Sequence, residues 1–378
     1  MKKVSLSIGL MAFSTLEVHM LFYLDASLLE DITVRPVQLL EFLENLCSAR
    51  RNGRHLIFAD KSTIEQLMKL PGLSPRAHRT LSVVVRRIRG KLPIFQACRV
   101  FIRVVHGDRM LTKNAVGGKT EIFISIDMIN GDELFAKPKL LVENRTDGEF
   151  YTALAKLLID QQRSTKGLML AYELVGGGGS QTPREYEALK LTEYLVYCIV
   201  DADVDFPKAP LGGNTAAPVF NSELKTPKAT ADALILNCYS AENLIHPLMI
   251  KSALNLMGTE SWYLEIEKFF ELDFWQFLAL KARKTCIDFE GVSEKNKYWA
   301  IYRPSFAGLP CPPPCVKDKC SIFTPLKNTT LIKVADYLNN SLNGVPFRIP
   351  DCQGHVRNEW EKIKDGIISW ACSGGRIA

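Results

Sequence analysis

Short apolar runs alternate with amphipathic segments along the first third of the chain. Strands are predicted at 19–25, 55–59, 100–105 and 120–128, and helices at 36–49, 61–69 and 74–90. In the last of these helices, Ser74 and Pro75 provide an N-cap and a first-turn proline, and Gly90 is expected to end it. Residues 1–135 are therefore predicted to form an N-terminal α/β domain, whose function the pattern does not assign.

The alternation becomes more regular from about residue 137. Strands are predicted at 140–142, 168–175, 194–200 and 232–237, separated by helices at 147–160 and 183–193. Strands that alternate with helices of ten to fifteen residues indicate a parallel sheet with right-handed crossovers. Residues 136–250 are predicted to form this α/β unit.

The pattern changes again beyond residue 250. Helices are predicted at 247–257, 262–284, 330–341 and 356–370, and the intervening chain is rich in Pro, Gly and Cys. The fold expected for the whole chain is α/β: an α/β N-terminal domain, a parallel sheet flanked by helices, and a mostly helical C-terminal region at 251–378.

Carboxylates follow two of the predicted central strands. Glu143 ends the first, and Asp201, Asp203 and Asp205 follow the third at alternate positions, which would place them on one side of an extended chain. Asp147 lies in the first turn of the helix after Glu143. Because parallel strands end at a common edge, these oxygens are predicted to form a site for Mg²⁺ or Mn²⁺. The alternative is a helix cap at Asp147 and a solvated turn at the three aspartates.

These motifs together resemble a TOPRIM domain. The resemblance comprises Val142-Glu143-Asn-Arg-Thr-Asp147-Gly, the glycine-rich turn at Gly176–Gly179 and Asp201-Ala-Asp203, and it covers roughly residues 137–250. The first motif is closest to that of the OLD-family and related anti-phage nucleases, which have glycine where this chain has Asn144. Ser240-Ala-Glu242-Asn243-Leu also resembles an element of those relatives.

The resemblance implies a metal-dependent nuclease of DNA or RNA. Glu143 would act as general acid or base, Asp201 and Asp203 would hold Mg²⁺, and Asp147 or Asp205 would complete the metal site. By the same analogy, the chain would be the effector of a bacterial anti-phage system, released by a separate ATPase or sensor chain. Two alternatives stay open: a TOPRIM-like binding or sensor subunit that does not cut, and an RNA-maturation nuclease.

One short motif could be taken for a phosphate-binding loop but departs from it, so an ATPase, if one is involved, is expected to be a separate chain. Val116-Gly-Gly-Lys-Thr120 has Lys113 where such a loop needs its first glycine, and Thr120 opens a strand pattern rather than a helix.

The predicted helix from Ser74 is strongly basic. The chain carries a net charge of +6, and residues 74–109 contain nine arginines or lysines against a single acid, Asp108. This charge favours contact with nucleic-acid phosphates, although a solvated helix face is the common alternative. The candidate nucleic-acid-binding residues are Arg76, Arg79, Arg86, Arg87 and Arg89.

Ten cysteines occur in a chain with no evident secretory signal and no apolar run long enough to span a bilayer. A cytoplasmic protein with reduced thiols and no membrane partner is therefore expected, and self-association into a homo-oligomer stays open. The irregularly spaced Cys-rich tail also offers candidate zinc ligands, with reduced structural cysteines as the alternative. These candidates are Cys311, Cys315, Cys320, Cys352 and His355.

Overall fold

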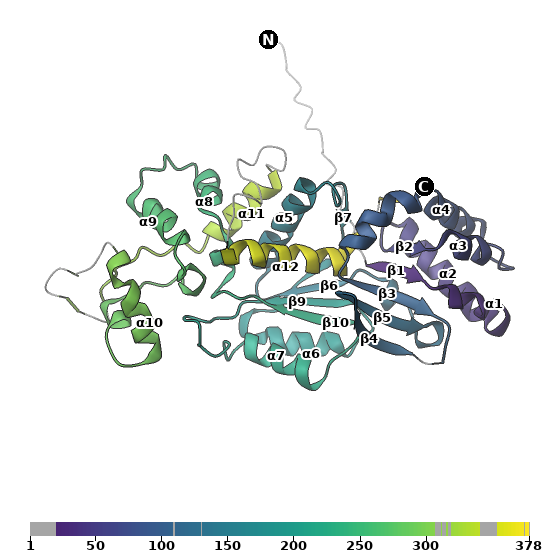
Figure 1. Cartoon of the computed structure of the whole chain (residues 1–378), viewed down its shortest axis with the longest axis horizontal. Helices are drawn as coiled ribbons and strands as arrows, with labels where there is room; N and C mark the ends of the chain where they lie inside the picture. Colours follow the sequence, from purple (N-terminus) through teal and green to yellow (C-terminus); the bar gives the residue numbers. More distant parts are fainter. Residues whose placement is uncertain are drawn as a thin grey trace, which may run out of the picture.

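The computed structural model describes residues 20–108, 110–129, 131–306, 311, 315–316, 319–340, 354–373 and 375–377. Within them, two β-sheets lie side by side and helices cover their faces (Figure 1). Lys113 on the edge of the first sheet joins the two, because its Nζ lies 3.1 Å from Oδ2 of Asp232 in the second. The α/β class predicted from the sequence is confirmed.

The first sheet has five strands in the order β2-β1-β3-β5-β4, of which only β4 is antiparallel to its neighbour. Its strands are β1 (Leu21–Leu24), β2 (Leu56–Ala59), β3 (Val100–Val105), β4 (Leu111–Val116) and β5 (Lys119–Ser125). The accompanying helices are α1 (Asp31–Val34), α2 (Pro36–Arg51), α3 (Lys61–Leu67) and α4 (Pro75–Ala97). Strand β4, which the sequence analysis missed, is exposed along most of its length and therefore has no apolar pattern to predict it.

Helix α4 does not end at Gly90, as its sequence predicted, but continues to Ala97 with Pro93 inside it. Tertiary packing accounts for the extension, because Ile94 is buried. The ring of Phe95 also stacks on Phe58 of β2 at a centroid distance of 4.7 Å. These contacts offset the cost of a glycine and a proline in a helix.

The segment that resembles a phosphate-binding loop is the turn of a β-hairpin. Val116 pairs with Lys119, and Gly117 and Gly118 between them have φ angles of +58° and +78°. Two successive positive φ angles define the tight turn that matches the twist of antiparallel strands, and glycine adopts them without steric cost.

The second sheet has four parallel strands in the order β10-β9-β6-β8. These are β6 (Lys139–Val142), β8 (Glu173–Gly176), β9 (Val196–Val200) and β10 (Ala231–Ile235). Helix α5 (Arg145–Gln161) packs on one face, and α6 (Thr182–Lys190) and α7 (Ala216–Lys225) pack on the other (Figure 1). The predicted strand at 168–175 is divided, because β7 (Met169–Leu170) pairs instead with β11 (Cys372–Ser373).

The remaining helices are α8 (Pro247–Leu254), α9 (Ser261–Phe270), α10 (Glu294–Tyr302), α11 (Thr330–Asn340) and α12 (Gly354–Ala371). The helix predicted at 262–284 ends at Phe270. Beyond this end the chain forms the 3-10 turn η6 (Trp275–Phe277), where Nδ2 of Asn243 donates to the carbonyls of Trp275 and Leu278 at 2.6 and 2.9 Å. Since Asn243 is buried, these hydrogen bonds attach the segment after α9 to the core.

Helix α12 runs along both sheets and ties the C-terminal region to them (Figure 1). Trp360 donates its Nε1–H to the carbonyl of Leu244 at 2.9 Å, and Ser369 accepts the backbone N–H of Arg99 at 2.8 Å. Among the described helices, none combines the length and apolarity that crossing a membrane requires.

Candidate functional site: an acidic sheet edge

Two of the predicted acids meet directly at the carboxyl end of the second sheet. Glu143 follows β6 and Asp201 follows the adjacent β9, and the backbone N–H of Asp201 donates to Oε1 of Glu143 at 2.9 Å. The phenol of Tyr151 in α5 donates to Oδ1 of Asp201 at 3.1 Å. The sheet register therefore brings together residues that are 58 positions apart in sequence.

Asp147 caps α5 and also belongs to this cluster. Its Oδ2 accepts the backbone N–H of Asn144 at 3.0 Å, which completes a capping box. Its carboxylate is nevertheless buried, and the negative charges of Glu242 and Asp201 interact with it. Helix capping and a place in the acidic cluster are therefore compatible at this residue.

Glu242 adds a carboxylate that the sequence analysis noticed in a motif but did not include among the site residues. It lies in η5 (Ala241–Leu244), just beyond β10, and is 3% exposed. The hydroxyl of Ser240 donates to its Oε2 at 2.8 Å, and Nζ of Lys281 lies 3.0 Å from its Oε1. Lys281, which no motif identified, thus supplies a cation beside the acids. We call the following set the acidic edge: Glu143, Asp147, Asp201, Asp203 and Glu242.

Burial and mutual repulsion make several of these acids weak. Burial raises the pKa of Glu143 to about 7, and the charges of Asp203 and Asp147 act in the same direction. Burial and the charge of Glu242 raise the pKa of Asp147 to about 6. The pKa of Asp201 lies well above its ordinary value for the same reasons, burial first and the charge of Glu143 second. The acidic edge therefore holds protons near neutral pH in the absence of a cation.

The chain after β9 does not keep the extended form that the alternate spacing predicted. Asp203 has a φ angle of +55°. A Cβ atom added at Gly212 would lie 2.5 Å from the Cβ of Asp203, so position 212 accommodates only glycine. Asp205 is paired elsewhere: Nζ of Lys295 lies 2.5 Å from its Oδ2, and Nε1 of Trp299 donates to its carbonyl at 3.0 Å. The structure thus places Asp201 and Asp203 at the acidic edge but directs Asp205 toward α10.

The glycine run packs against the backbone of the same site. Gly177 N–H donates to the carbonyl of Val142 at 2.7 Å, and Gly179 N–H donates to that of Glu143 at 3.0 Å. These two N–H groups bind the backbone at the end of β6, so they are not available to a phosphate.

The donor set fits a hard divalent cation. It consists of carboxylate oxygens, which Mg²⁺ and Mn²⁺ prefer, and burial together with mutual repulsion raises their pKa values, so a bound cation would stabilise their charged forms. The hydroxyl of Thr215 is close enough to Glu143 and Asp203 to lower the pKa of both, yet it is buried and completes no hydrogen bond of ordinary geometry. A buried hydroxyl in this state, next to carboxylates, is consistent with a site that binds a further polar group or ion.

The five arginines of α4 are all exposed, and two of them line a cavity. Arg76 and Arg79 line a cavity of about 610 Å³ whose wall includes Arg51 from α2 and Arg376 from the C-terminal segment. Arg86, Arg87 and Arg89 lie further along the helix and outside this cavity. Helix α4 covers the first sheet, whereas the acidic edge belongs to the second.

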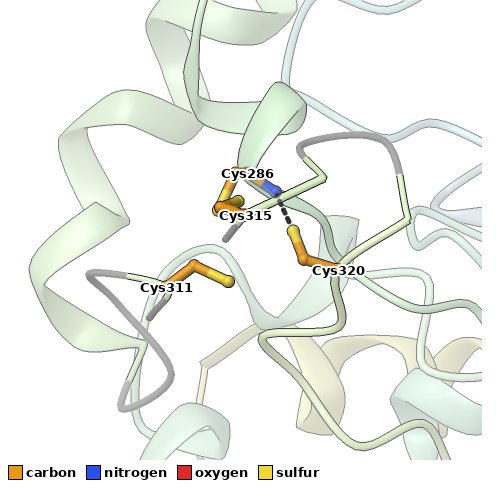
Figure 2. A group of neighbouring side chains, drawn as sticks. All are labelled: Cys286, Cys311, Cys315 and Cys320. Carbon is orange, nitrogen blue, oxygen red and sulfur yellow. Dashed lines mark hydrogen bonds between the residues drawn. The ribbon is translucent and has the colours of Figure 1, made fainter. Parts of the chain in front are cut away.

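The predicted zinc ligands are only partly brought together (Figure 2). Cys311, Cys315 and Cys320 converge with Cys286, a residue that the sequence analysis did not select. His355 lies apart from them, in α12, where burial lowers its pKa to about 4 and the charge of Asp273 acts against that change. Cys352 lies outside the described residues.

Comparisons with protein-family models, with curated proteins and with solved structures found no match to this chain. The fold and the site define the chain as an α/β protein with an acid-rich edge on a four-stranded parallel sheet.

Proposed function

We propose that the chain is a Mg²⁺-dependent nuclease that hydrolyses phosphodiester bonds at the acidic edge. The observation that carries this proposal is the contact of Glu143 with Asp201 at adjacent strand ends, with Asp147 and Glu242 interacting electrostatically with them. Carboxylates that repel one another are stabilised by a divalent cation, and such cations serve phosphoryl chemistry. The TOPRIM resemblance points to the same activity, and the four-stranded parallel sheet supports it.

The protein groups have distinct tasks in this proposal. A bound Mg²⁺ would polarise the phosphodiester and lower the pKa of a water molecule. Glu143, whose pKa is about 7, can accept or return a proton near neutral pH. Asp201, oriented by the phenol of Tyr151, would hold the ion together with Asp147, Asp203 and Glu242. Lys281 would stabilise the developing negative charge on a phosphate oxygen.

The arginine cavity supports a polyanionic substrate or regulator. Arg51, Arg76 and Arg79 come from two helices and face one space, whose wall is lined by Arg376 as well. The positive charge continues along α4: burial is the main cause of the lowered pKa of Arg50 and of Lys91, and the nearby charge of Arg87 lowers both further. Contacts of this kind bind phosphates without reading sequence.

The biological setting is proposed from the resemblance alone. A nuclease similar to the OLD family would be an effector in a bacterial anti-phage system, and a separate ATPase or sensor chain would release its activity. A constitutive RNA-maturation nuclease would need no such partner.

The test is cleavage of supercoiled plasmid, single-stranded DNA and total tRNA by the purified chain, with Mg²⁺, Mn²⁺ or EDTA. Glu143→Gln removes the proposed proton carrier, and Glu149→Gln makes the same change in α5 at a residue whose partner is Arg145. We expect metal-dependent cutting that Glu143→Gln abolishes and Glu149→Gln preserves.

Other outcomes are equally informative. Cutting that survives EDTA, or that both variants retain, would contradict the proposed site. A wild-type chain that neither cuts nor binds Mn²⁺ would instead favour the non-cutting binding or sensor subunit. Mn²⁺ binding without cutting would direct the search to an activating partner.

A further inference from the structure

The four converging cysteines come from two segments of the C-terminal region. Cys286 opens η7 (Cys286–Phe289), and the others follow on irregular chain 25 to 34 positions later: Cys311, Cys315 and Cys320. All four Sγ atoms lie within 4.8 Å of one another, and the side chains point toward a common centre (Figure 2).

The spacing of the sulfurs matches a tetrahedral metal site rather than a disulfide. Sγ of Cys286 and Sγ of Cys315 are 3.7 Å apart. A disulfide joins sulfurs at about 2.05 Å. Four thiolates at about 2.3 Å from one zinc ion in tetrahedral geometry are separated by about 3.8 Å.

A backbone donor already serves one of the sulfurs. The N–H of Cys286 points at Sγ of Cys320 at a distance of 3.1 Å (Figure 2). Hydrogen bonds from the backbone orient metal-bound thiolates and favour their charged form. The two segments that carry the cysteines also run together beyond the cluster, because Ile322 N–H donates to the carbonyl of Lys284 at 3.0 Å and Leu326 N–H donates to that of Leu280 at 2.8 Å.

Ordinary core packing does not account for the group. Cysteines elsewhere in the described chain are buried as single apolar side chains or as the pair Cys98 and Cys372. Cys311, Cys315 and Cys320 are only half-buried, so three thiols face one another where they gain little from removal from water.

We propose that Cys286, Cys311, Cys315 and Cys320 bind one Zn²⁺ as a closed structural site. Four protein thiolates leave no open position for a substrate, so the ion stabilises the fold and takes no part in a reaction. On binding, the four thiols release their protons and form four zinc–sulfur bonds, with no change in oxidation state.

The site would hold in place a region that supplies groups to the acidic edge. The segment between α9 and α10 contains little regular structure, and it carries both Lys281, which pairs with Glu242, and Cys286. Lys295 and Trp299, which hold Asp205, lie in the helix that follows η7. The zinc ion would therefore fix the loop from which Lys281 reaches the acids.

Metal analysis tests this proposal without reference to any activity. The full chain is purified without added metal, and zinc and iron per chain are measured by mass spectrometry, with X-ray absorption for the ligand shell. We expect about one zinc per chain with four sulfur neighbours at about 2.3 Å. Iron in place of zinc, or metal at trace level only, would overturn the proposal.

Two matched serine variants distinguish the zinc ligands that the structure brings together from those predicted from the sequence. Cys286→Ser should lose the zinc, whereas Cys352→Ser should retain it. Zinc that survives Cys286→Ser but is lost with Cys352→Ser would contradict the assignment. If Cys286→Ser does not fold, alkylation of the wild-type chain decides: the four thiols should be protected until zinc is removed, and ready alkylation at full zinc content would overturn the site.

Discussion

The acidic edge and the cysteine cluster are both candidate metal sites, but different features of the chain build them. The acids follow β6, β9 and β10, so the register of a parallel sheet determines where they lie. The cysteines occupy η7 and irregular chain, and backbone hydrogen bonds between the two segments, rather than a sheet register, bring them together. At the first site, the fold therefore holds the ligands close together against their repulsion, whereas at the second site the bound metal would hold the fold together.

The largest expected effect is a contrast in stability between conservative changes at the two sites. Cys315→Ser, at a half-buried residue, should lower the free energy of unfolding by about 3 kcal/mol or more, because a lost zinc ligand removes binding energy that is also folding energy. Asp201→Asn should leave the metal-free chain as stable or make it more stable, because it replaces a carboxyl group, whose charged form is disfavoured by burial and by Glu143, with a neutral amide. Chemical denaturation of the zinc-loaded chain, without chelator and without added Mg²⁺ or Mn²⁺, measures both. A loss below about 0.5 kcal/mol for Cys315→Ser would be typical of an ordinary surface substitution and would contradict its role as a zinc ligand.

Two aspartates four positions apart provide the next test. Asp201→Asn should lower the cleavage rate by roughly a thousand-fold, because it alters a proposed metal ligand in contact with Glu143. Asp205→Asn should change the rate only a few-fold, since Lys295 already neutralises that carboxylate away from the acidic edge. Initial cleavage rates at saturating Mg²⁺ measure the difference. Equal losses of rate in the two variants would show that Asp205 belongs to the site.

The metal-free stability should depend on pH in the direction that the raised pKa values set. Glu143 titrates at about 7 in the folded chain against 4.5 as a free side chain, and Asp147 at about 6 against 3.8. The folded state therefore retains protons that the unfolded state has released, so stability falls as pH rises from about 4 to 7. We expect a contribution on the order of 2 kcal/mol in thermal or chemical unfolding. Saturating Mg²⁺, or Glu143→Gln, should make the stability much less dependent on pH. A pH dependence that Glu143→Gln leaves unchanged would show that other groups cause it.

The smallest effect concerns Lys281. Lys281→Gln removes the cation beside Glu242 and should lower the cleavage rate about ten-fold, with a further rise in the pKa of the neighbouring acids. Lys297→Gln, at an exposed position of α10, is the matched control. A pH–rate profile shifted to higher pH in Lys281→Gln alone would confirm that Lys281 acts on the acids.

The same contrast explains what could be predicted from the sequence. Apolar runs and helix caps predict β6, β9 and α5 closely, and the acids are found because strand ends in a parallel sheet have a fixed place. Glu242 was visible in a motif but not as a ligand, because nothing in the local pattern shows that η5 turns back toward Asp147. The departure of Asp205 depends on a positive φ at Asp203 and on the distant Lys295, and neither has a sequence signal.

The cysteine cluster was harder to predict for a related reason. Cys286 lies 25 positions before Cys311, a separation that no short ligand spacing includes. The helix predicted through 262–284 also placed the approach to Cys286 on regular structure, whereas the helix ends at Phe270 and Asn243 binds two carbonyls of the loop that follows. The position of that loop depends on such tertiary hydrogen bonds, which leave no pattern in the local sequence.

The most direct test of the nuclease site is calorimetric titration of the metal-free chain with Mn²⁺ at pH 7.5, on wild type, Asp201→Asn and Asp205→Asn. We predict saturable binding with proton release in wild type and Asp205→Asn, and its loss in Asp201→Asn, because the raised pKa values mean that protons must leave as the cation enters. Binding that Asp201→Asn retains in full, or no binding to the wild-type chain, would contradict the acidic edge as a metal site.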